Sequence, residues 1–518
     1  MADEHKDNKD FEKTQKDLAE MVQKLMQEVT PRINPAAEPK QPETDEEQKK
    51  KRDKILEFNL KPKDVKKYLD RFVIKQEDAK RVLSTAICDH YNHIRLSKNG
   101  KGLKNYMKQN ILILGPTGVG KTYLIRHLAD LIGVPFVKAD ATKFSETGYV
   151  GGDVDDLIRD LVHKANGDIE LAQYGIIYMD EIDKITSAPN AQGRDVSGAG
   201  VQRNLLKIME ETEIPLRNPQ DIQSQLQGML DFQRSGKIQK PMVNTKHILF
   251  IGSGACDGLR PIIEKRLKES HIGFGSQPKK TDSASASNIL KEAKTQDFTE
   301  FGFESEFIGR LPIRVVCDPL NEEDLYQILT ACEESILAQY LSSFSAYDIS
   351  IHPQEKALWE ISKFAAREKT GARGLFTICE RVFRDLKYEL PSSNIREFTL
   401  NPEMVLNPKS TVQELLKEER KIRTDQILRS IDRFEEIFAQ RTNVLIGFDL
   451  SARETIEEKV LSEEHDAEKW LANLLSNYEY GLKLIQNRKP REKFILTKDV
   501  IQNPNGTLDE WIKEAYDK

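Results

Sequence analysis

A run of glycines ending in lysine and threonine, GPTGVGKT, has the residue types and spacing of a phosphate-binding loop. Glycines let backbone N–H groups turn inward around phosphate oxygens. Lys121 can bring a positive charge to the β- and γ-phosphates, and the Thr122 hydroxyl can ligate Mg²⁺. The pattern predicts a nucleotide site, with ATP and Mg²⁺ as ligands, formed by Gly115, Pro116, Thr117, Gly118, Val119, Gly120, Lys121 and Thr122.

Elements on both sides of this loop can hold it in place. The apolar run from Ile111 to Leu114 is typical of a buried strand of a parallel sheet. Tyr123 to Ile132 predicts a helix whose positive N-terminal end faces the loop. A chance glycine-rich turn is the alternative, and the flanking strand and helix disfavour it.

Two adjacent carboxylates follow a second apolar strand in the sequence IIYMDE, Ile176 to Glu181. This stretch resembles a Walker B strand, in which Asp180 would hold Mg²⁺ directly or through water. Glu181 would polarise the attacking water as a general base. The alternative is a solvated acidic strand end, and the upstream phosphate-binding loop favours the catalytic interpretation.

Two arginines lie in short loop-like sequences, Arg310 in EFIGRLP and Arg373 in TGARGL. An arginine on a short loop can donate to a γ-phosphate and stabilise charge in the transition state. An isolated arginine is usually a surface ion-pair partner, so spacing alone supports this role only weakly.

The composition excludes several classes of protein. The chain has 518 residues, enough for two to four domains, with 78 Lys plus Arg, 84 Asp plus Glu and a net charge of −6, which gives no overall basic field for nucleic acid. Its five cysteines include no CxxC pair, which argues against zinc or disulfides and fits a cytoplasmic protein. No apolar run approaches a membrane span, and the polar start MADEHKDNKD is not a targeting sequence.

Shifts in composition predict four segments. Residues 1–52 are a flexible, charged segment with one amphipathic helix, 53–318 a large ATPase domain, 319–407 a small helical lid domain and 408–518 a helical extension. Leu18 to Val29 contributes the apolar face of that first helix, which either packs locally or mediates docking. Pro31 to Arg52 has the composition of a flexible linker.

The pattern from Ile55 to Asp318 alternates helices and strands, as in an α/β protein with a doubly wound parallel sheet. Further strands are expected at Phe136–Val137, His247–Gly252 and Arg314–Cys317, a mostly helical stretch at Tyr68–Arg95, and a polar insertion at Ser276–Thr299. Beyond a hinge at Asp318-Pro319-Leu320, helices are expected over Glu322–Tyr340, Gln354–Arg367 and Gly374–Leu390, followed by a strand near Glu397–Leu406.

The extension after Pro408 carries no catalytic signature. Ile427, Ile431, Phe434 and Phe438 form one helical stripe. Ser451 and Glu454 resemble a capping box that opens another helix.

A series of motifs in order makes the chain resemble the ClpX branch of the AAA+ protein unfoldases, in which a P-loop domain carries a small helical lid. The matching sequences between Lys61 and Met404 are FVIKQEDAK, GPTGVGKT, FSETGYVGGDVDDLI, IIYMDEIDKI, RDVSGAGVQ, HILFIGSGAC, HIGFG, EFIGRLP and GARGL.

The resemblance implies roles for the matched residues. Val73 and Ile74 would line the adenine pocket, and Ser253 would occupy the sensor-1 position. Arg310 would be an arginine finger reaching the nucleotide of a neighbouring subunit. Arg373 would be sensor 2, contacting the nucleotide of its own chain from the lid. One nucleotide would then contact both domains and set their angle.

Two further matches imply contacts with polypeptides. Tyr149 and Val150, between Gly148 and Gly151, match the pore loop that grips substrate, and Arg194–Gly198 matches the second pore loop. Ile272, Gly273 and Phe274 match the tripeptide that docks ClpX-type rings on the ClpP peptidase.

The chain also departs from the family pattern. It lacks the four-cysteine N-terminal zinc module and any Arg-Lys-His loop within Glu213–Asn244, and it carries the extra tail. Lys75 replaces a usual glycine, and Phe376 stands where arginine is common. The stretch Val162–Gly175 is too short for the insertion of the relative HslU, which disfavours an HslV partner.

The interpretation favoured by these features is an ATP-dependent protein unfoldase. It would form a ring of identical subunits, the hexamer that the resemblance implies, and feed unfolded or tagged proteins to a ClpP-like peptidase. The alternatives are a peptidase-independent remodelling chaperone, a nucleotide-controlled assembly scaffold and a nucleic-acid-directed motor. The acidic balance and the Gly148–Gly151 loop disfavour the last of these.

Overall fold

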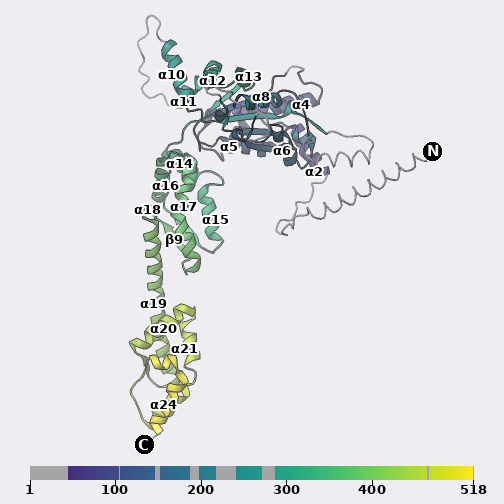
Figure 1. Ribbon diagram of the computed structural model, residues 1–518. Coiled ribbons are helices and arrows are strands. Elements are labelled where there is room, and N and C mark those ends of the chain that lie inside the picture. Colours follow the sequence, from purple (N-terminus) through teal and green to yellow (C-terminus); the bar gives the residue numbers. More distant parts are fainter. Residues whose placement is uncertain are drawn as a thin grey trace, which may run out of the picture.

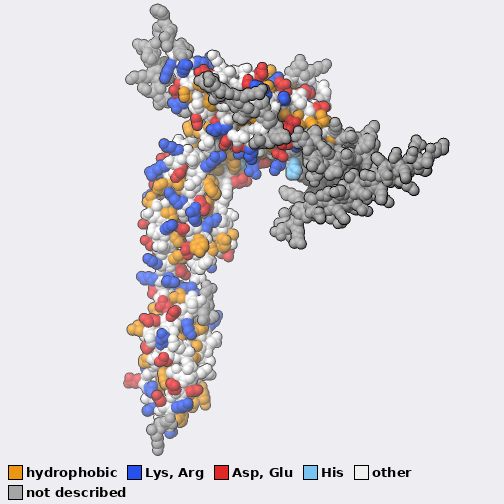
Figure 2. All heavy atoms as spheres, in the orientation of Figure 1, with side chains coloured by type: hydrophobic (Ala, Val, Ile, Leu, Met, Phe, Trp, Pro, Cys, Tyr) orange, Lys and Arg blue, Asp and Glu red, His pale blue; other side chains and the backbone are white. Residues whose placement is uncertain are grey.

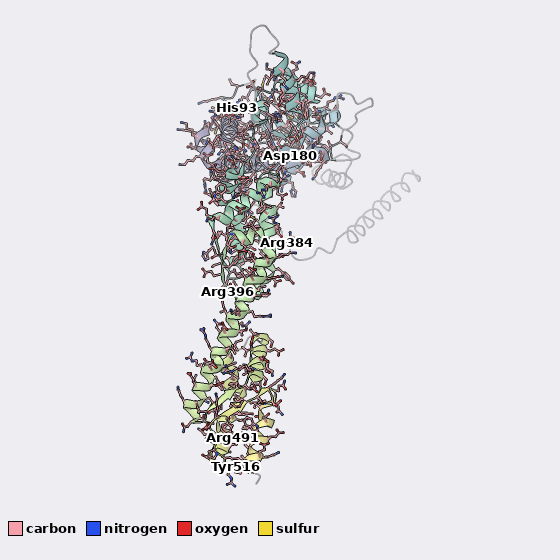
Figure 3. All side chains as sticks on the ribbon, turned by 90° about the vertical axis from the view of Figure 1, so that its left-hand side faces the viewer. His93, Asp180, Arg384, Arg396, Arg491 and Tyr516 are labelled. Carbon is pink, nitrogen blue, oxygen red and sulfur yellow. The ribbon has the colours of Figure 1, made fainter. Side chains whose placement is uncertain are left out.

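The computed structural model describes residues 45–103, 106–145, 152–186, 198–216, 241–270, 286–463 and 466–516. Buried apolar side chains in this part of the chain form three clusters, which span Ile55–Cys317, Leu325–Val412 and Ile427–Leu508. We call the corresponding parts the large unit, the small unit and the C-terminal unit. They follow one another in space (Figure 1), and a view from the side has Asp180 in the first, Arg384 in the second and Arg491 in the third (Figure 3).

The large unit is built around a five-stranded parallel sheet with the order β2-β3-β6-β1-β7. Its strands are β1 (Ile111–Leu114), β2 (Phe136–Asp140), β3 (Ile176–Asp180), β6 (Leu249–Gly254) and β7 (Ile313–Val316). β6 lies between β1 and β3, so the carboxyl ends of these three strands are neighbours. Strands are added on both sides of β1, which confirms the doubly wound α/β fold that the sequence predicts.

The remaining elements of the large unit surround this sheet, and two of them, β4 and β5, form an antiparallel pair. They are α2 (Asp45–Leu56), α3 (Pro62–Leu69), α4 (Glu77–Lys98), α5 (Lys121–Ile132), α6 (Asp156–Lys164), α7 (Ile169–Ala172), α8 (Gly198–Met209), β4 (Glu213–Pro215), β5 (Met242–Asn244), α10 (Leu259–Ser270), α11 (Ala286–Lys291), α12 (Thr295–Phe301) and α13 (Ser305–Gly309), with short 3₁₀ helices at Ala141–Lys143, Ile182–Ile185 and Thr245–His247. All four residues of β1 are buried, as expected for a parallel sheet covered on both faces.

The helix expected over Tyr68–Arg95 is interrupted. α3 ends at Leu69 and α4 begins at Glu77. Lys75 and Gln76 have φ angles of 60° and 57°, which a right-handed helix does not allow. The intervening loop is therefore free to contribute Val73 and Ile74 to a binding surface.

Two stretches expected to lack regular structure contain helices. The final residues of the expected linker Pro31–Arg52 belong to α2, because Ile55 is buried and Arg52 pairs with Glu170 at 3.0 Å. The expected polar insertion Ser276–Thr299 contains α11 and most of α12, because Leu290 and Phe298 pack into the core. Residues 271–285 lie outside the described part of the chain.

The small unit consists of α14 (Glu322–Thr330), α15 (Ile336–Ser345), α16 (Glu355–Arg367), α17 (Ala372–Glu389) and α18 (Pro402–Leu406), with a parallel pair of strands, β8 (Ser350–Pro353) and β9 (Glu397–Leu400), and a 3₁₀ turn at Leu390–Ser392. The single helix expected over Glu322–Tyr340 is divided, because the Ser335 side chain accepts from Ala338 N and starts α15. The strand expected to reach Leu406 ends at Leu400, because Asn401 caps α18 and Pro402 begins it.

The C-terminal unit is reached through the long helix α19 (Pro408–Thr442), whose residues Ile427, Ile431, Phe434 and Phe438 are all buried. It contains α20 (Leu450–Glu463), α21 (Ala467–Leu474), α22 (Tyr478–Arg488), α23 (Lys498–Gln502) and α24 (Pro504–Tyr516), with paired parallel strands β10 (Ile446–Phe448) and β11 (Phe494–Leu496). The expected Ser451–Glu454 capping box is wrong. The Asp449 carboxylate accepts from Ala452 N at 2.7 Å and therefore caps α20 two residues earlier.

The surface carries both signs of charge. On the face shown in Figure 2, Lys and Arg are interspersed with Asp and Glu along the small and C-terminal units. All five cysteines are free thiols. Within the described ranges, every helix is too short or too polar to cross a lipid bilayer.

Candidate nucleotide-binding site

The phosphate-binding loop leaves the carboxyl end of β1 and runs directly into α5. Gly115, Gly118 and Gly120 have φ angles of 143°, 73° and 96°, at which a side chain would be strained. Gly120 is the N-cap of α5, so Lys121 and Thr122 form the first turn of the helix. Free backbone N–H groups and the helix dipole favour an anion at this position.

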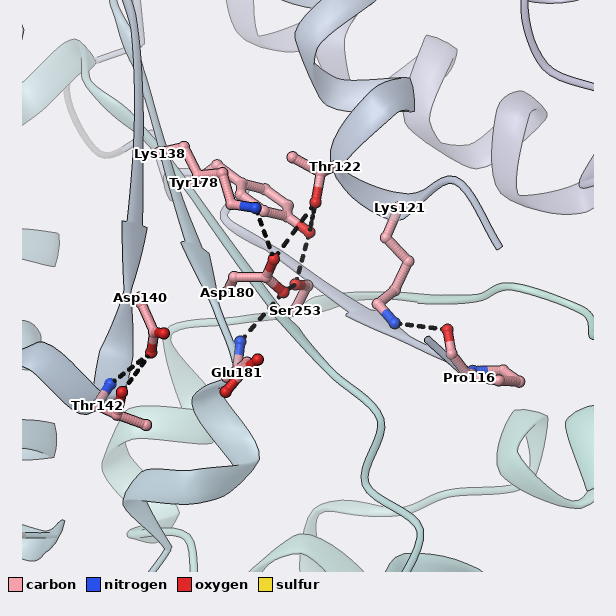
Figure 4. Close-up of polar contacts among 10 residues, drawn as sticks. All are labelled: Pro116, Lys121, Thr122, Lys138, Asp140, Thr142, Tyr178, Asp180, Glu181 and Ser253. Carbon is pink, nitrogen blue, oxygen red and sulfur yellow. Dashed lines mark hydrogen bonds and ion pairs between the residues drawn. The ribbon is translucent and has the colours of Figure 1, made fainter. Parts of the chain in front are cut away.

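Lys121 is held inside this loop rather than in solvent. Its Nζ donates to the carbonyl oxygen of Gly115 at 2.6 Å and to that of Pro116 at 2.8 Å. Figure 4 shows the bond to Pro116. The residue is only 8% exposed, and burial lowers the pKa of its ammonium group. An ammonium group bonded to neutral carbonyls next to a helix N-terminus can turn towards phosphate oxygens.

Asp180 ends β3 opposite the first turn of α5. Its Oδ2 lies 3.3 Å from Thr122 Oγ1 and 3.1 Å from Lys138 Nζ, and its Oδ1 accepts from Ser253 Oγ at 2.7 Å (Figure 4). Burial raises the pKa of Asp180, but the hydrogen bond from Ser253 and the ammonium group of Lys138 outweigh it, so the pKa is lowered. Asp180 is therefore ionised at neutral pH.

Thr122 and Asp180 fit a magnesium ion. A hydroxyl and a carboxylate oxygen 3.3 Å apart supply hard oxygen donors from two facing elements. Within the described ranges, no group of three or more His, Cys, Asp and Glu side chains could hold a metal. This donor set suits Mg²⁺, which binds through one or two protein oxygens together with phosphate oxygens and water.

Glu181 follows Asp180 in an unusual backbone conformation. Its φ angle of 56° lies in the left-handed region, which is uncommon for residues other than glycine and occurs often at functional sites. The residue is exposed and lines the same cavity as Lys121 and Thr122. It therefore has access to water next to a bound phosphate.

Ser253 lies at the carboxyl end of β6, between the strand that leads to the phosphate-binding loop and the strand that ends in Asp180. It is fully buried. Besides its bond to Asp180, its Oγ lies 2.6 Å from the hydroxyl of Tyr178. The sensor-1 candidate is thus in direct contact with the Walker B carboxylate.

A cavity of about 610 Å³ extends from the phosphate-binding loop to the small unit. Val73 and Ile74 line it on one side. The apolar side chains of Leu320, Ile328 and Ile336 line it from the hinge and the small unit, an environment that suits a planar base. Arg373 and Phe376 of α17 line it as well. The cavity therefore contains the arginine that matches the sensor-2 position and the phenylalanine that departs from the expected pattern.

The small unit touches the phosphate-binding loop directly. Ala372 N donates to Gly118 O at 2.8 Å. A Cβ at Gly118 would lie 2.0 Å from Thr370 O, and a Cβ at Gly371 would lie 2.6 Å from Gly118 O. Only glycine fits at these two positions, and this close approach brings Arg373 next to the loop.

The loop that carries Val73 and Ile74 is also bonded to the small unit. Lys75 Nζ lies 2.6 Å from Asp324 Oδ2 and 2.8 Å from Pro319 O, and Arg71 makes two hydrogen bonds to Glu333, of 2.7 and 2.6 Å. The left-handed φ of Lys75 is a conformation that glycine adopts without strain, which is compatible with the glycine that the resemblance implies at this position. In this chain the lysine gains contacts across the hinge.

Arg310 lies at the amino end of β7, whereas the phosphate-binding loop follows the carboxyl end of the neighbouring strand β1. β7 pairs with β1 so that Ile313 is level with Ile111, and the phosphate-binding loop follows the far end of β1. Arg310 precedes β7 and is therefore separated from the loop by at least the length of a four-residue strand, roughly 13 Å. Its side chain is 51% exposed and bonds to Glu210 at 2.5 Å.

Several predicted residues lie outside the described part of the chain. They are Gly148, Tyr149, Val150 and Gly151 of the first pore loop, residues 194–197 of the second, and the docking tripeptide Ile272, Gly273 and Phe274. Their roles stay predictions.

Two site residues were missed by the sequence analysis, Tyr178 and Lys138. Tyr178 precedes Asp180 by two residues and therefore points to the same face of β3. Lys138 pairs with Tyr178 across β2 and β3. The two-residue period of a strand could have indicated Tyr178, whereas Lys138 needed the strand order.

Comparison with known proteins gives consistent relatives. Residues 107–314 match the family model described as AAA domain (Cdc48 subfamily). The chain is 42% identical over 353 residues to a protein of Borrelia duttonii named ATP-dependent Clp protease ATP-binding subunit ClpX, covering 67% of this chain and 78% of the relative. It is 40% identical over 365 residues to the protein of the same name from Treponema denticola, covering 69% and 84%.

Proposed function

This chain belongs to the ClpX family of AAA+ ATPases, and from this premise we propose that it is the unfolding and translocating subunit of a two-component Clp protease in the cytoplasm. The observation that supports the proposal most is the shared cavity. It brings the phosphate-binding loop, the Asp180–Glu181 pair and Arg373 of the small unit to one nucleotide-sized space, while Arg310 lies outside this space, at the amino end of β7.

In the proposed reaction, Lys121 and the backbone of residues 115–122 bind the phosphates of ATP, and Val73 and Ile74 contact the adenine. Mg²⁺ held by Thr122 and Asp180 would neutralise charge on the β- and γ-phosphate oxygens. Glu181 accepts a proton from the water that attacks the γ-phosphorus. Ser253 keeps Asp180 in place, and Arg373 contacts the phosphates from the lid.

The position of Arg310 supports a ring. Arg310 and the cavity of its own chain lie at opposite ends of the paired strands β7 and β1. We therefore propose that its guanidinium group donates to the γ-phosphate bound by the next subunit. Each site is then completed by a neighbour, which head-to-tail contacts in a closed ring provide. The family resemblance makes six the expected number of subunits.

The contacts across the hinge support coupling of hydrolysis to movement. A nucleotide in the cavity would touch both the Gly118 loop and Arg373, so loss of the γ-phosphate changes what holds the two units together. We propose domain limits of 53–318 for the large domain and 319–407 for the lid, with 408–518 as a separate extension.

Tyr149 is proposed to grip the substrate, since an aromatic side chain between glycines can contact any polypeptide by bulk. Tyr149→Ala should leave ATP turnover within about twofold of wild type, because the proposed hydrolytic chemistry gives this residue no role. Unfolding of a tagged fluorescent protein should slow about tenfold or more, which corresponds to an increase of about 1.4 kcal/mol in the activation free energy of the unfolding step. The measurement is loss of fluorescence with ATP in excess, and an unchanged unfolding rate would contradict the pore assignment.

Ile272, Gly273 and Phe274 are proposed to dock on a ClpP-like peptidase. Degradation of a tagged substrate should require the chain, the peptidase and ATP together. Deleting the tripeptide should abolish degradation and co-sedimentation with the peptidase while unfolding continues. Unfolding without degradation by the intact chain would instead favour the remodelling chaperone, and docking by the deletion variant would contradict this assignment.

A further inference from the structure

Tyr178 occupies a position that the proposed mechanism leaves without a role. It lies in the middle of β3, two residues before Asp180, and is fully buried. Its hydroxyl lies 2.6 Å from Ser253 Oγ and 3.2 Å from Thr122 Oγ1 (Figure 4). One phenol in the middle of β3 therefore connects the carboxyl end of β6 with the first turn of α5.

The hydrogen bonds around Tyr178 have a defined direction. Ser253 Oγ donates its proton to Asp180 Oδ1, so its oxygen accepts from the Tyr178 hydroxyl. The Thr122 hydroxyl donates towards Tyr178 Oη and Asp180 Oδ2, at 3.2 and 3.3 Å. The result is a closed ring of four side chains, in which the three hydroxyls all lead to one carboxylate.

This ring determines how the two oxygens of Asp180 are used. Ser253 Oγ and the backbone N–H of Glu181 donate to Oδ1, whereas Oδ2 faces Thr122 and the ammonium group of Lys138. Tyr178 holds both Ser253 and Thr122, so it restricts the rotation of each hydroxyl. Groups that orient metal ligands in this way commonly alter metal affinity 10- to 100-fold when removed.

We propose that Tyr178 is a positioning residue that, through Ser253 and Thr122, orients the oxygens with which the site binds Mg²⁺·ATP. The inference rests on the proposed function, because it takes Thr122 and Asp180 as the metal-binding pair. It assigns to Tyr178 a role in metal-dependent nucleotide binding in addition to filling the core.

The test measures binding rather than turnover. In a Glu181→Gln background, the affinity for a fluorescent ATP analogue is measured with Mg²⁺ and with EDTA. Tyr178→Phe keeps the aromatic side chain and removes only its hydroxyl. We therefore expect the Mg²⁺-dependent gain in affinity to fall about tenfold, with the affinity in EDTA unchanged. Equal Mg²⁺ dependence with and without the Tyr178 hydroxyl would overturn the proposal.

Tyr91→Phe is the matched control. Tyr91 is also fully buried in the large unit, and its hydroxyl makes one hydrogen bond, to Tyr174 O at 3.0 Å. This variant should keep the full Mg²⁺ dependence. An equal loss in Tyr91→Phe would show that any buried hydroxyl has the same effect and would refute a positioning role.

Ser253→Ala breaks the same ring at another point and provides a second variant if Tyr178→Phe does not fold. Both single variants should lose a similar amount of Mg²⁺-dependent affinity. The double variant should lose no more than either one, because both substitutions interrupt the same relay of hydrogen bonds from Tyr178 through Ser253 to Asp180. Additive losses would contradict the relay. Thr122→Ala distinguishes failure of the positioning role of Tyr178 from failure of the proposed function. Unchanged Mg²⁺ dependence in that variant would reject the metal site of Thr122 and Asp180 itself.

Discussion

Replacing Glu181 by glutamine is expected to abolish ATP hydrolysis while leaving ATP binding intact. The substitution keeps the size of the side chain. It removes the one property that the proposed chemistry requires of this residue, a carboxylate that accepts a proton from water. Glu181 lines the cavity next to Lys121 and Thr122 and has no part in the Asp180–Thr122–Ser253 contacts except through its backbone N–H. Loss of a general base reduces turnover by roughly 10²- to 10⁴-fold.

Turnover by phosphate release and binding of a fluorescent ATP analogue measure the two parts of this prediction separately. Glu300→Gln is a suitable control, since it makes the same chemical change at an exposed position on α12 of the large unit. The control should turn over ATP at the wild-type rate. If Glu181→Gln hydrolysed ATP normally, another group would have to activate the water, and the role assigned to Glu181 would be wrong.

Replacing Arg310 by alanine is expected to reduce ATP turnover about 10³-fold or more, the effect of removing an arginine finger. Each chain should still bind ATP, because its own Lys121 and phosphate-binding loop hold the phosphates and its own Arg310 lies at the other end of the strands. The change should also leave the fold intact, since an exposed ion pair such as Arg310–Glu210 contributes at most about 1 kcal/mol. Phosphate release and analogue binding again separate turnover from affinity.

Glu210→Gln is the matched control for Arg310. It removes the negative partner of the ion pair and keeps Arg310, whose backbone carbonyl accepts from Asn110 Nδ2 at 3.0 Å. This variant should retain most of its turnover. A loss as large as that of Arg310→Ala would mean that the ion pair, and not a contact with phosphate, explains the effect.

The parts of the site that local sequence determines were predictable. GPTGVGKT fixes a strand, a turn and a helix within a few residues, so the positions of Lys121 and Thr122 followed from the motif alone. The pairing of β1, β3 and β6 explains why Asp180 and Ser253 lie next to Thr122, and the alternation of strands and helices predicted this kind of sheet without its strand order. Arg373 was assigned by family resemblance, since spacing alone says nothing of its distance from the loop.

The features that were missed depend on contacts between distant residues. Lys138 contacts Asp180 only because β2 and β3 are neighbours. Lys75 was noted as a departure, but its bond to Asp324 depends on how the small unit sits against the large one. The mistaken cap at Ser451 has a local cause. The charged carboxylate of Asp449, two residues earlier, accepts from Ala452 N and starts the helix before Ser451, whose own hydroxyl donates to Asp449.

The extension after Pro408 illustrates a different limit. Its apolar stripe correctly indicated a helix, α19, and the stripe forms part of a separate core with α20 to α24. The residues of α19 between Leu416 and Ile427 are mostly exposed, so the C-terminal unit is joined to the small unit by a solvated stretch of helix (Figure 1). Sequence patterns indicate such a core only as periodicity, because its long-range packing partners carry no motif.

The central claim is that each hydrolytic site combines Glu181 of one subunit with Arg310 of the next. The most direct measurement is ATP turnover by equal amounts of the inactive variants Glu181→Gln and Arg310→Ala, mixed and allowed to reassemble. Random assembly pairs an intact Glu181 with an intact neighbouring Arg310 at about one interface in four, so turnover should rise well above that of either variant alone. A mixture no more active than the mean of its two components, although the subunits have exchanged, would contradict a site shared between neighbours.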